Sequence, residues 1–184
     1  KSVVGFAFDK MPWYRDFQTI LFLADGIRND YGSLAELVKE KYPDKNIFKT
    51  DLMLGHGTTS EGVQQVRHNL RKPFPFADDQ FDAIVLRRGL CCCDGNNQTC
   101  AGIYLDYNSI SVFLHEVERV LNKPNPKAVA HLGGFAVYNA DVLTRFSAAS
   151  YELMESFPVK VTLLKDRRMP TRFAGLLIQP EGPR

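Results

Sequence analysis

The chain has 184 residues, of which 45% are hydrophobic and 24% charged, a balance typical of a folded globular domain and not of a disordered segment. Its formal net charge of +2 is too small to indicate a nucleic-acid-binding protein, and no apolar run approaches the roughly 20 residues of a membrane helix. We therefore expect a single domain over residues 1–184 that binds neither nucleic acid nor a membrane.

The four cysteines are confined to one segment, between Cys91 and Cys100. A secreted disulfide framework spreads its cysteines so that bridges close long loops, and the first residues lack the pattern of a signal peptide. Both features predict a reducing compartment, namely the cytoplasm.

Two apolar strands are expected in the first third of the chain. Residues 19–24 form a short apolar run that ends at Asp25-Gly26, as a buried strand does when it enters a turn. Residues 46–50 form a second strand, which ends at Asp51. With a helix between them, these strands make one unit of a parallel sheet.

That helix is predicted from the residues that follow Ser33, where apolar side chains recur at helical spacing until Pro43 stops them. Ser33 is predicted to be the N-cap. Glu36 stands three residues later, where a capping box places the acidic side chain that returns to the N-cap backbone.

The middle of the chain contains one clear strand signal. Residues 52–62 are predicted to be a loop, whereas residues 63–70 fit either a third strand or one face of a helix. Residues 81–86 form a short apolar run that contains β-branched side chains, which predicts a strand. Asp79 and Asp82, at its start, are expected in a solvated turn.

Helix and strand signals alternate in the second half. Apolar residues between 110 and 121 lie on one helical stripe, with Glu116 and Arg119 outside it at the spacing of a local ion pair. There follow a strand (128–132), a helix (141–156) and two strands that can pair as an antiparallel hairpin (159–164 and 172–178). The pattern predicts an α/β fold: a doubly wound, mostly parallel sheet with an antiparallel last strand, in three α/β/α layers.

Three segments resemble the class I S-adenosylmethionine-dependent methyltransferases. Residues 71–85 (RKPFPFADDQFDAIV) are similar to the family's lead into its fourth strand, and residues 113–124 (FLHEVERVLNKP) to the helix before its fifth. The closing pair of strands resembles the family's reversed last strand. The resemblance covers most of the chain and implies S-adenosylmethionine as the cofactor.

The family's first turn is rich in glycine, which lets the backbone approach the cofactor closely. Here Gly26 matches the first glycine and Gly32 stands at the helix start, but the middle glycine is missing and Arg28 is bulky. The acidic residue expected two positions before Gly26 is Ala24. Asp25 is adjacent, and it points to the opposite face if the strand geometry continues.

The resemblance implies further cofactor contacts at the ends of the other strands. Asp51 is placed to accept both ribose hydroxyls, although an aspartate that ends a strand can also simply cap a loop. If residues 63–70 are the third strand, Asn69 takes the position that meets the adenine amino group, and an amide oxygen can accept that bond. Leu52 and Leu70 adjoin these residues, and Arg87 lines the same pocket at the end of the fourth strand.

The cysteine segment has three interpretations: small residues in a packed loop, a disulfide or metal site, or a reactive thiolate near Arg87 or Arg88. Neither a C-x-x-C spacing nor a histidine pair is present, so we assign no metal ligands.

The histidines have no assigned chemistry. His56 and His68 stand among polar residues and are expected to face water. His131 is expected to be a core residue, with a role as a base at the end of the fifth strand as the alternative.

The first functional hypothesis is a methyltransferase acting on a small molecule or a protein side chain, with no catalytic residue assigned. The alternatives are an interaction or scaffold module that has lost the cofactor, and a cysteine-based metal or redox site on the same sheet. The sequence makes no prediction of the methyl acceptor or of the oligomeric state.

Overall fold

The computed structural model describes residues 15–25, 33–51, 54–86, 107–133, 140–165 and 173–181. The elements in chain order are β1 (Thr19–Leu23), α2 (Leu34–Lys41), β2 (Asn46–Asp51), β3 (Gly57–Thr58), β4 (Gln64–Arg67), β5 (Ala83–Leu86), α3 (Tyr107–Val120), β6 (Val129–Gly133), α4 (Ala140–Ser156), β7 (Val159–Lys165) and β8 (Phe173–Pro180). The predicted alternation of strands and helices is confirmed.

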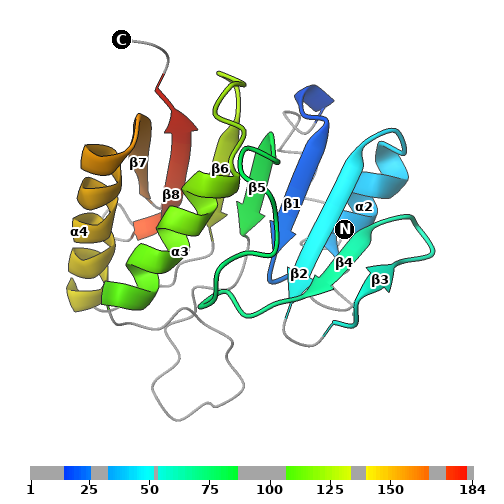
Figure 1. The fold of residues 1–184 in the computed structure, drawn as a ribbon, viewed down its shortest axis with the longest axis horizontal. Helices are drawn as coiled ribbons and strands as arrows, with labels where there is room; N and C mark the ends of the chain where they lie inside the picture. The colour runs from blue at the N-terminus through cyan, green and yellow to red at the C-terminus, as the bar shows by residue number, and fades with distance from the viewer. Residues whose placement is uncertain are drawn as a thin grey trace.

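The strands form one sheet in the order β3-β4-β2-β1-β5-β6-β8-β7 (Figure 1). β4, β2, β1, β5 and β6 run parallel. β8 is inserted antiparallel between β6 and β7, and the short β3 pairs antiparallel with β4. The predicted hairpin and reversed last strand are therefore confirmed, with β7 as the edge strand.

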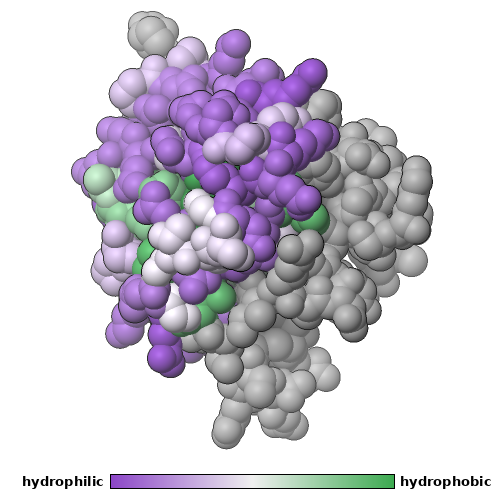
Figure 2. Space-filling view, turned by 90° about the vertical axis from the view of Figure 1, so that its right-hand side faces the viewer, coloured by the Kyte–Doolittle hydropathy of each residue, from purple (hydrophilic) through white to green (hydrophobic). Residues whose placement is uncertain are grey.

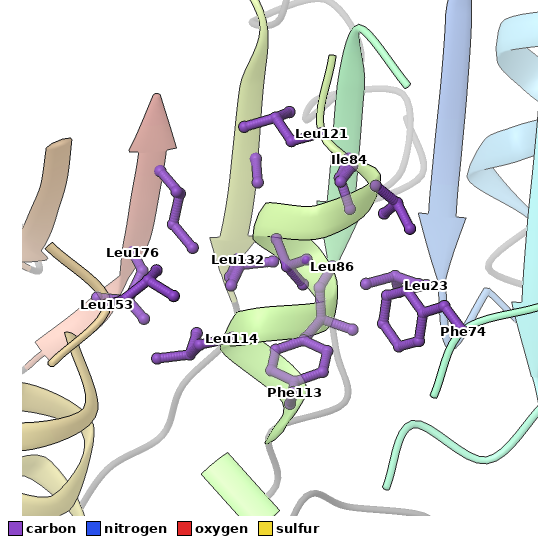
Figure 3. Packing of buried hydrophobic residues seen from close by; sticks show 14 of the residues in the cluster. Leu23, Phe74, Ile84, Leu86, Phe113, Leu114, Leu121, Leu132, Leu153 and Leu176 are labelled. Atoms are coloured by element: carbon purple, nitrogen blue, oxygen red, sulfur yellow. The ribbon is translucent and has the colours of Figure 1, made fainter. Parts of the chain in front are cut away.

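The two faces of the sheet are covered by different helices, which gives the predicted three layers. α2 packs on one face, where it meets Ile20 and Phe22 of β1. α3 and α4 cover the other face, where the larger hydrophobic cluster lies (Figure 3). Leu21 and Leu23, which alternate along β1 with Ile20 and Phe22, belong to this larger cluster. The period-2 alternation of β1 thus divides its side chains between the two cores.

The segment between β2 and β5 contains no helix in its described residues, 54–82. Residues 63–70 contain strand β4, so the strand interpretation is correct and the helical one is wrong. The predicted loop over 52–62 contains the two-residue β3. On the side of the molecule where β3 and β4 lie, the described surface is mainly hydrophilic (Figure 2).

Asp82 corrects the expectation of a solvated turn. It is only 9% exposed, and its Oδ2 accepts hydrogen bonds from the backbone N–H groups of Gln18 and Thr19, both at 3.0 Å. Its Oδ1 accepts from the side-chain amides of Asn122, at 2.9 Å, and Asn125, at 3.0 Å. The carboxylate therefore joins the start of β1 to the loop after α3.

Arg119 forms the predicted ion pair with Glu116 at 2.8 Å, and it does more than the spacing predicts. The same guanidinium contacts Asp78 at 2.6 Å and donates to the carbonyls of Phe74, at 3.0 Å, and Phe76, at 2.9 Å. It thereby fixes the segment that leads into β5 against α3. Within the described residues, none of the helices combines the length and apolarity needed to cross a bilayer.

Candidate functional site

The candidate site lies where the parallel strands end. β1, β2, β4 and β5 have their carboxyl ends at the same edge of the sheet. From β1 the chain continues to β2 on one side, and it later enters β5 on the other side. The strand order therefore reverses at β1, and in open α/β sheets ligands bind at the carboxyl ends beside such a reversal.

The end of β1 departs from strand geometry. Ala24 has a positive φ of 50°, in the left-handed region, which a non-glycine residue adopts uncommonly. The next residue, Asp25, is still hydrogen-bonded to the sheet: its N–H donates to the carbonyl of Thr50 on β2 at 3.1 Å. The strand geometry therefore does not continue through Ala24, which was the condition for the prediction that Asp25 points to the opposite face.

The Asp25 carboxylate caps helix α2. Its Oδ2 accepts from the Ser33 hydroxyl and from the N–H of Ala35, both at 2.8 Å, and its Oδ1 accepts from the N–H of Leu34 at 3.2 Å. Ser33 is the N-cap as predicted, and its Oγ accepts from the N–H of Glu36 at 3.5 Å. Two side chains thus satisfy three backbone donors in the first turn of α2.

The predicted return of the Glu36 side chain to Ser33 is not what the structure shows. Glu36 turns into the core instead, where its Oε1 lies 2.7 Å from Nζ of Lys49 on β2, with both side chains buried. The capping box is wrong because a buried ammonium on the neighbouring strand is a stronger partner for the carboxylate than a backbone N–H at the helix end.

Asp51 ends β2 beside β1, as the ribose assignment requires. It is half-buried, and its carbonyl accepts from the N–H of His68 at 3.1 Å. In the sheet it is aligned with Arg67, the last residue of β4. The ends of β2 and β4 are therefore joined at the position where the sequence placed the ribose and the base.

Asn69 and Leu70 stand two and three residues after the end of β4, but both are engaged within the protein. The Asn69 Oδ1 accepts from the N–H of Arg71 at 3.0 Å, and its carbonyl accepts from the N–H of Lys72 at 2.9 Å. Leu70 is 5% exposed and belongs to the core beneath α3. The structure thus places both residues near the site and shows them in turn and core contacts.

The structure corrects the expectation for His68. It was expected to face water, yet its Nε2 is buried without a hydrogen-bond partner, and its ring packs edge-on against Phe74 with centroids 5.3 Å apart. Burial lowers the pKa of the imidazole, opposed in part by a hydrogen bond with the Lys72 backbone and by the Glu116 charge. The ring is therefore neutral at pH 7. The aromatic side chain six residues later in the chain is the only sequence signal of this packing.

Gly26, Gly32, Leu52 and Arg87 lie outside the described residues, as do Arg28 and the cysteines Cys91, Cys92, Cys93 and Cys100. Their assignments stay predictions. Within the ranges that the structure describes, no three His, Cys, Asp or Glu side chains are grouped as metal ligands would be.

No protein-family model matches the chain, and no curated protein matches its sequence. Solved structures resemble it in fold. A putative rRNA-methylase from Clostridium thermocellum gives a TM-score of 0.54 at 13% identity, with 100% of this chain and 98% of that chain covered. The plantazolicin methyltransferase BpumL, in complex with a monoazolic desmethylPZN analog and SAH, gives 0.51 at 9% identity, with 97% and 89% covered. An O-methyltransferase family protein from Burkholderia thailandensis gives 0.51 at 14% identity, with 98% and 56% covered.

These neighbours and the strand order identify the fold as that of the S-adenosylmethionine-dependent methyltransferases. The fold recognised from the residues 71–85 and 113–124 is thereby confirmed.

Proposed function

We propose that the chain is an S-adenosylmethionine-dependent methyltransferase that holds its cofactor at the carboxyl ends of β1, β2 and β4. The acceptor in this proposal is a small molecule or a protein side chain, because the net charge of +2 gives little attraction for nucleic acid.

The observation that carries the proposal is the position of the Asp25 carboxylate. Dinucleotide-binding sheets hold a pyrophosphate at the amino end of the helix that follows the first strand. In this chain, the N–H groups of Leu34 and Ala35 at that end already donate to Asp25. A second anion there would lack donors and would be repelled by the carboxylate. The site therefore disfavours dinucleotides and suits a cofactor without phosphates, whose sulfonium carries a positive charge.

Asp51 supports the same ligand from the neighbouring strand. A carboxylate at this place can accept both hydroxyls of a ribose, the contact that acidic residues provide in nucleoside-binding sheets of this kind. The cofactor supplies a methyl group activated by the sulfonium. The protein's task is to align donor and acceptor and to exclude water, which is sufficient for in-line transfer to a nucleophile that carries no acidic proton.

Titration calorimetry tests the proposal directly. We expect S-adenosylmethionine and S-adenosylhomocysteine (SAH) to bind and NAD⁺ not to bind. Asp51→Ala should weaken SAH binding by about tenfold or more, which corresponds to one or two hydrogen bonds to a charged group. Asp44→Ala is the matched control, because Asp44 is an exposed aspartate just before the amino end of β2, away from the proposed site.

The second candidate is an interaction or scaffold module on the same fold. It is favoured by the sequence at Arg28, where a bulky residue replaces a glycine of the resembling family, and by Asp25, whose two carboxylate oxygens are engaged within the protein. Absence of SAH binding at millimolar concentration by a folded protein would reject the methyltransferase and leave this candidate.

A further inference from the structure

The outer edge of β7 is closed by groups of the chain itself. β7 is the last strand of the sheet, and α4 packs beside it (Figure 1). In an antiparallel ladder, alternate residues direct their backbone groups away from the partner strand. The N–H of Val159 donates to the carbonyl of Phe157 at 2.8 Å, and the N–H of Val161 donates to the Sδ of Met154 at 3.4 Å. A thioether in the last turn of α4 is therefore an acceptor at the edge of the sheet.

Met154 lies at the border between the core and the solvent. The residue is partly exposed, and it is not a member of the larger hydrophobic cluster to which its neighbour Leu153 belongs. Its sulfur carries two lone pairs, and the N–H of Val161 engages one of them. A second lone pair is left for reaction. Peroxides convert a methionine thioether into a sulfoxide, which is polar.

We infer that Met154 is an oxidation site for hydroperoxides, and that its sulfoxide holds the edge of β7 to α4 more firmly than the thioether does. A lone pair of Sδ attacks one oxygen of hydrogen peroxide, the O–O bond breaks, and the attacked oxygen stays on the sulfur. The other oxygen leaves as hydroxide and takes up the proton of the transferred oxygen, which gives water. The sulfur is oxidised and the peroxide is reduced by the same electron pair.

The firmer contact follows from the chemistry of the acceptor. A thioether sulfur accepts hydrogen bonds only weakly, whereas the oxygen of a sulfoxide is strongly polar. An N–H···O bond spans about 2.7–3.2 Å between its heavy atoms. The 3.4 Å between the Val161 nitrogen and Sδ leaves room for the flexible side chain to turn its new oxygen toward the N–H. Because Met154 stands outside the hydrophobic cluster, the added polarity is not placed in the core.

Hydrogen peroxide is the probe that tests this inference. Peptide mass spectrometry should find one oxygen atom added at Met154 in protein that keeps its circular dichroism spectrum. Hydrogen exchange at the N–H of Val161, followed by NMR, should then slow by about fivefold, the effect of one ordinary hydrogen bond. The N–H of Val159 is the internal control: its acceptor is a backbone carbonyl, so its exchange should not change.

Two variants separate the role of the sulfur from its packing. Met154→Leu keeps a similar volume and removes the acceptor, so exchange at Val161 should be faster than in the wild type and insensitive to peroxide. This variant retains the other methionines of the chain, so it also controls for their oxidation. Met154→Gln carries an amide oxygen near the place of the sulfoxide oxygen, so it should slow exchange at Val161 without peroxide.

Three results would overturn the inference. The first is a Met154 that stays unmodified while other methionines are oxidised. The second is a Met154 sulfoxide in folded protein with exchange at Val161 unchanged or faster. The third is a loss of the circular dichroism signal that occurs in the wild type and not in Met154→Leu. If Met154→Leu does not fold, Met154→Gln and the peroxide-treated wild type decide. No step involves S-adenosylmethionine, so the proposed function stands or falls separately.

Discussion

Lys49 and Glu36 form a buried ion pair at 2.7 Å between the middle of β2 and the first turn of α2. The second carboxylate oxygen of Glu36, Oε2, is buried without a partner. The pair therefore joins α2 to β2, the strand that ends at Asp51.

Lys49→Met should destabilise the protein by about 3–5 kcal/mol, because it leaves the Glu36 charge buried and alone. The double variant Lys49→Met/Glu36→Leu should recover most of this loss, since apolar side chains of similar volume often replace a buried pair without cost. Urea denaturation measures both. A double variant as unstable as the single one would show that the packing of these side chains, and not their charge, is essential.

Asp82 should make folding sensitive to acid. Burial raises the pKa of this carboxyl, but the hydrogen bonds from Asn125, Thr19, Asn122 and Gln18 outweigh burial and hold the pKa below its ordinary value of 3.8. A carboxyl with a lowered pKa stabilises the fold above its ordinary pKa and loses that contribution as the pH falls through the folded-state value. Asp82→Asn should cost roughly 2–4 kcal/mol at pH 7 and flatten the acid-unfolding curve, as followed by circular dichroism.

Glu118 is the control, because its pKa is shifted in the opposite direction to that of Asp82. Burial raises its pKa above the ordinary 4.5, against the opposing effect of Lys123, so it takes up a proton more readily in the folded protein. It therefore counteracts acid unfolding. Glu118→Gln should steepen the acid-unfolding curve where Asp82→Asn flattens it, and equal effects of the two variants would contradict the assignment.

Arg119→Lys should loosen the segment from Phe74 to Asp78. A lysine keeps the charge but cannot serve two carboxylates and two carbonyls at once, so we expect a loss of about 1–2 kcal/mol. Hydrogen exchange should be faster at the N–H of Phe74, which donates to Glu116 at 2.5 Å. The exposed Arg145 of α4 gives the comparison: Arg145→Lys should change neither quantity.

Gly175 allows no side chain where β8 meets β6. A Cβ at this position would clash with the carbonyl oxygen of Leu132 and would lie 3.0 Å from the Cα of Gly133. Gly175→Ala should therefore cost about 3 kcal/mol or more, because backbone atoms have to move. Gly55→Ala, at a position with open space around it, should lie within about 0.5 kcal/mol of wild type. Thermal unfolding separates the two.

The sequence predicted the features that depend on neighbouring residues. Apolar runs identified the strands, the spacing between Ile110 and Leu121 identified α3, and the i,i+3 spacing identified the Glu116–Arg119 pair. Asp82 was misplaced because its partner Gln18 is 64 residues away, and no local pattern records such a contact. Glu36 was misplaced for the same reason, since its partner lies on the next strand.

The site was predictable only in outline. Topology alone brings the ends of β1, β2 and β4 together, so Asp25 and Asp51 could be placed there from the chain order. The left-handed φ of Ala24 was not predictable from an alanine, and it changes the direction in which Asp25 points. The polar neighbours of His68 in the sequence predict a surface residue, and they give no sign that Phe74 packs against its ring.

The strand order has a consequence for self-association. An open sheet ends in two strands whose outer backbone groups can recruit another chain. At one end stands β3, which has only two residues, and at the other stands β7, which carries the exposed Lys160 and has a break in register between Leu164 and Lys165. β3 is too short, and β7 too charged and irregular, to pair readily with a strand of another molecule. We therefore expect this sheet to resist growth into ordered aggregates from either end.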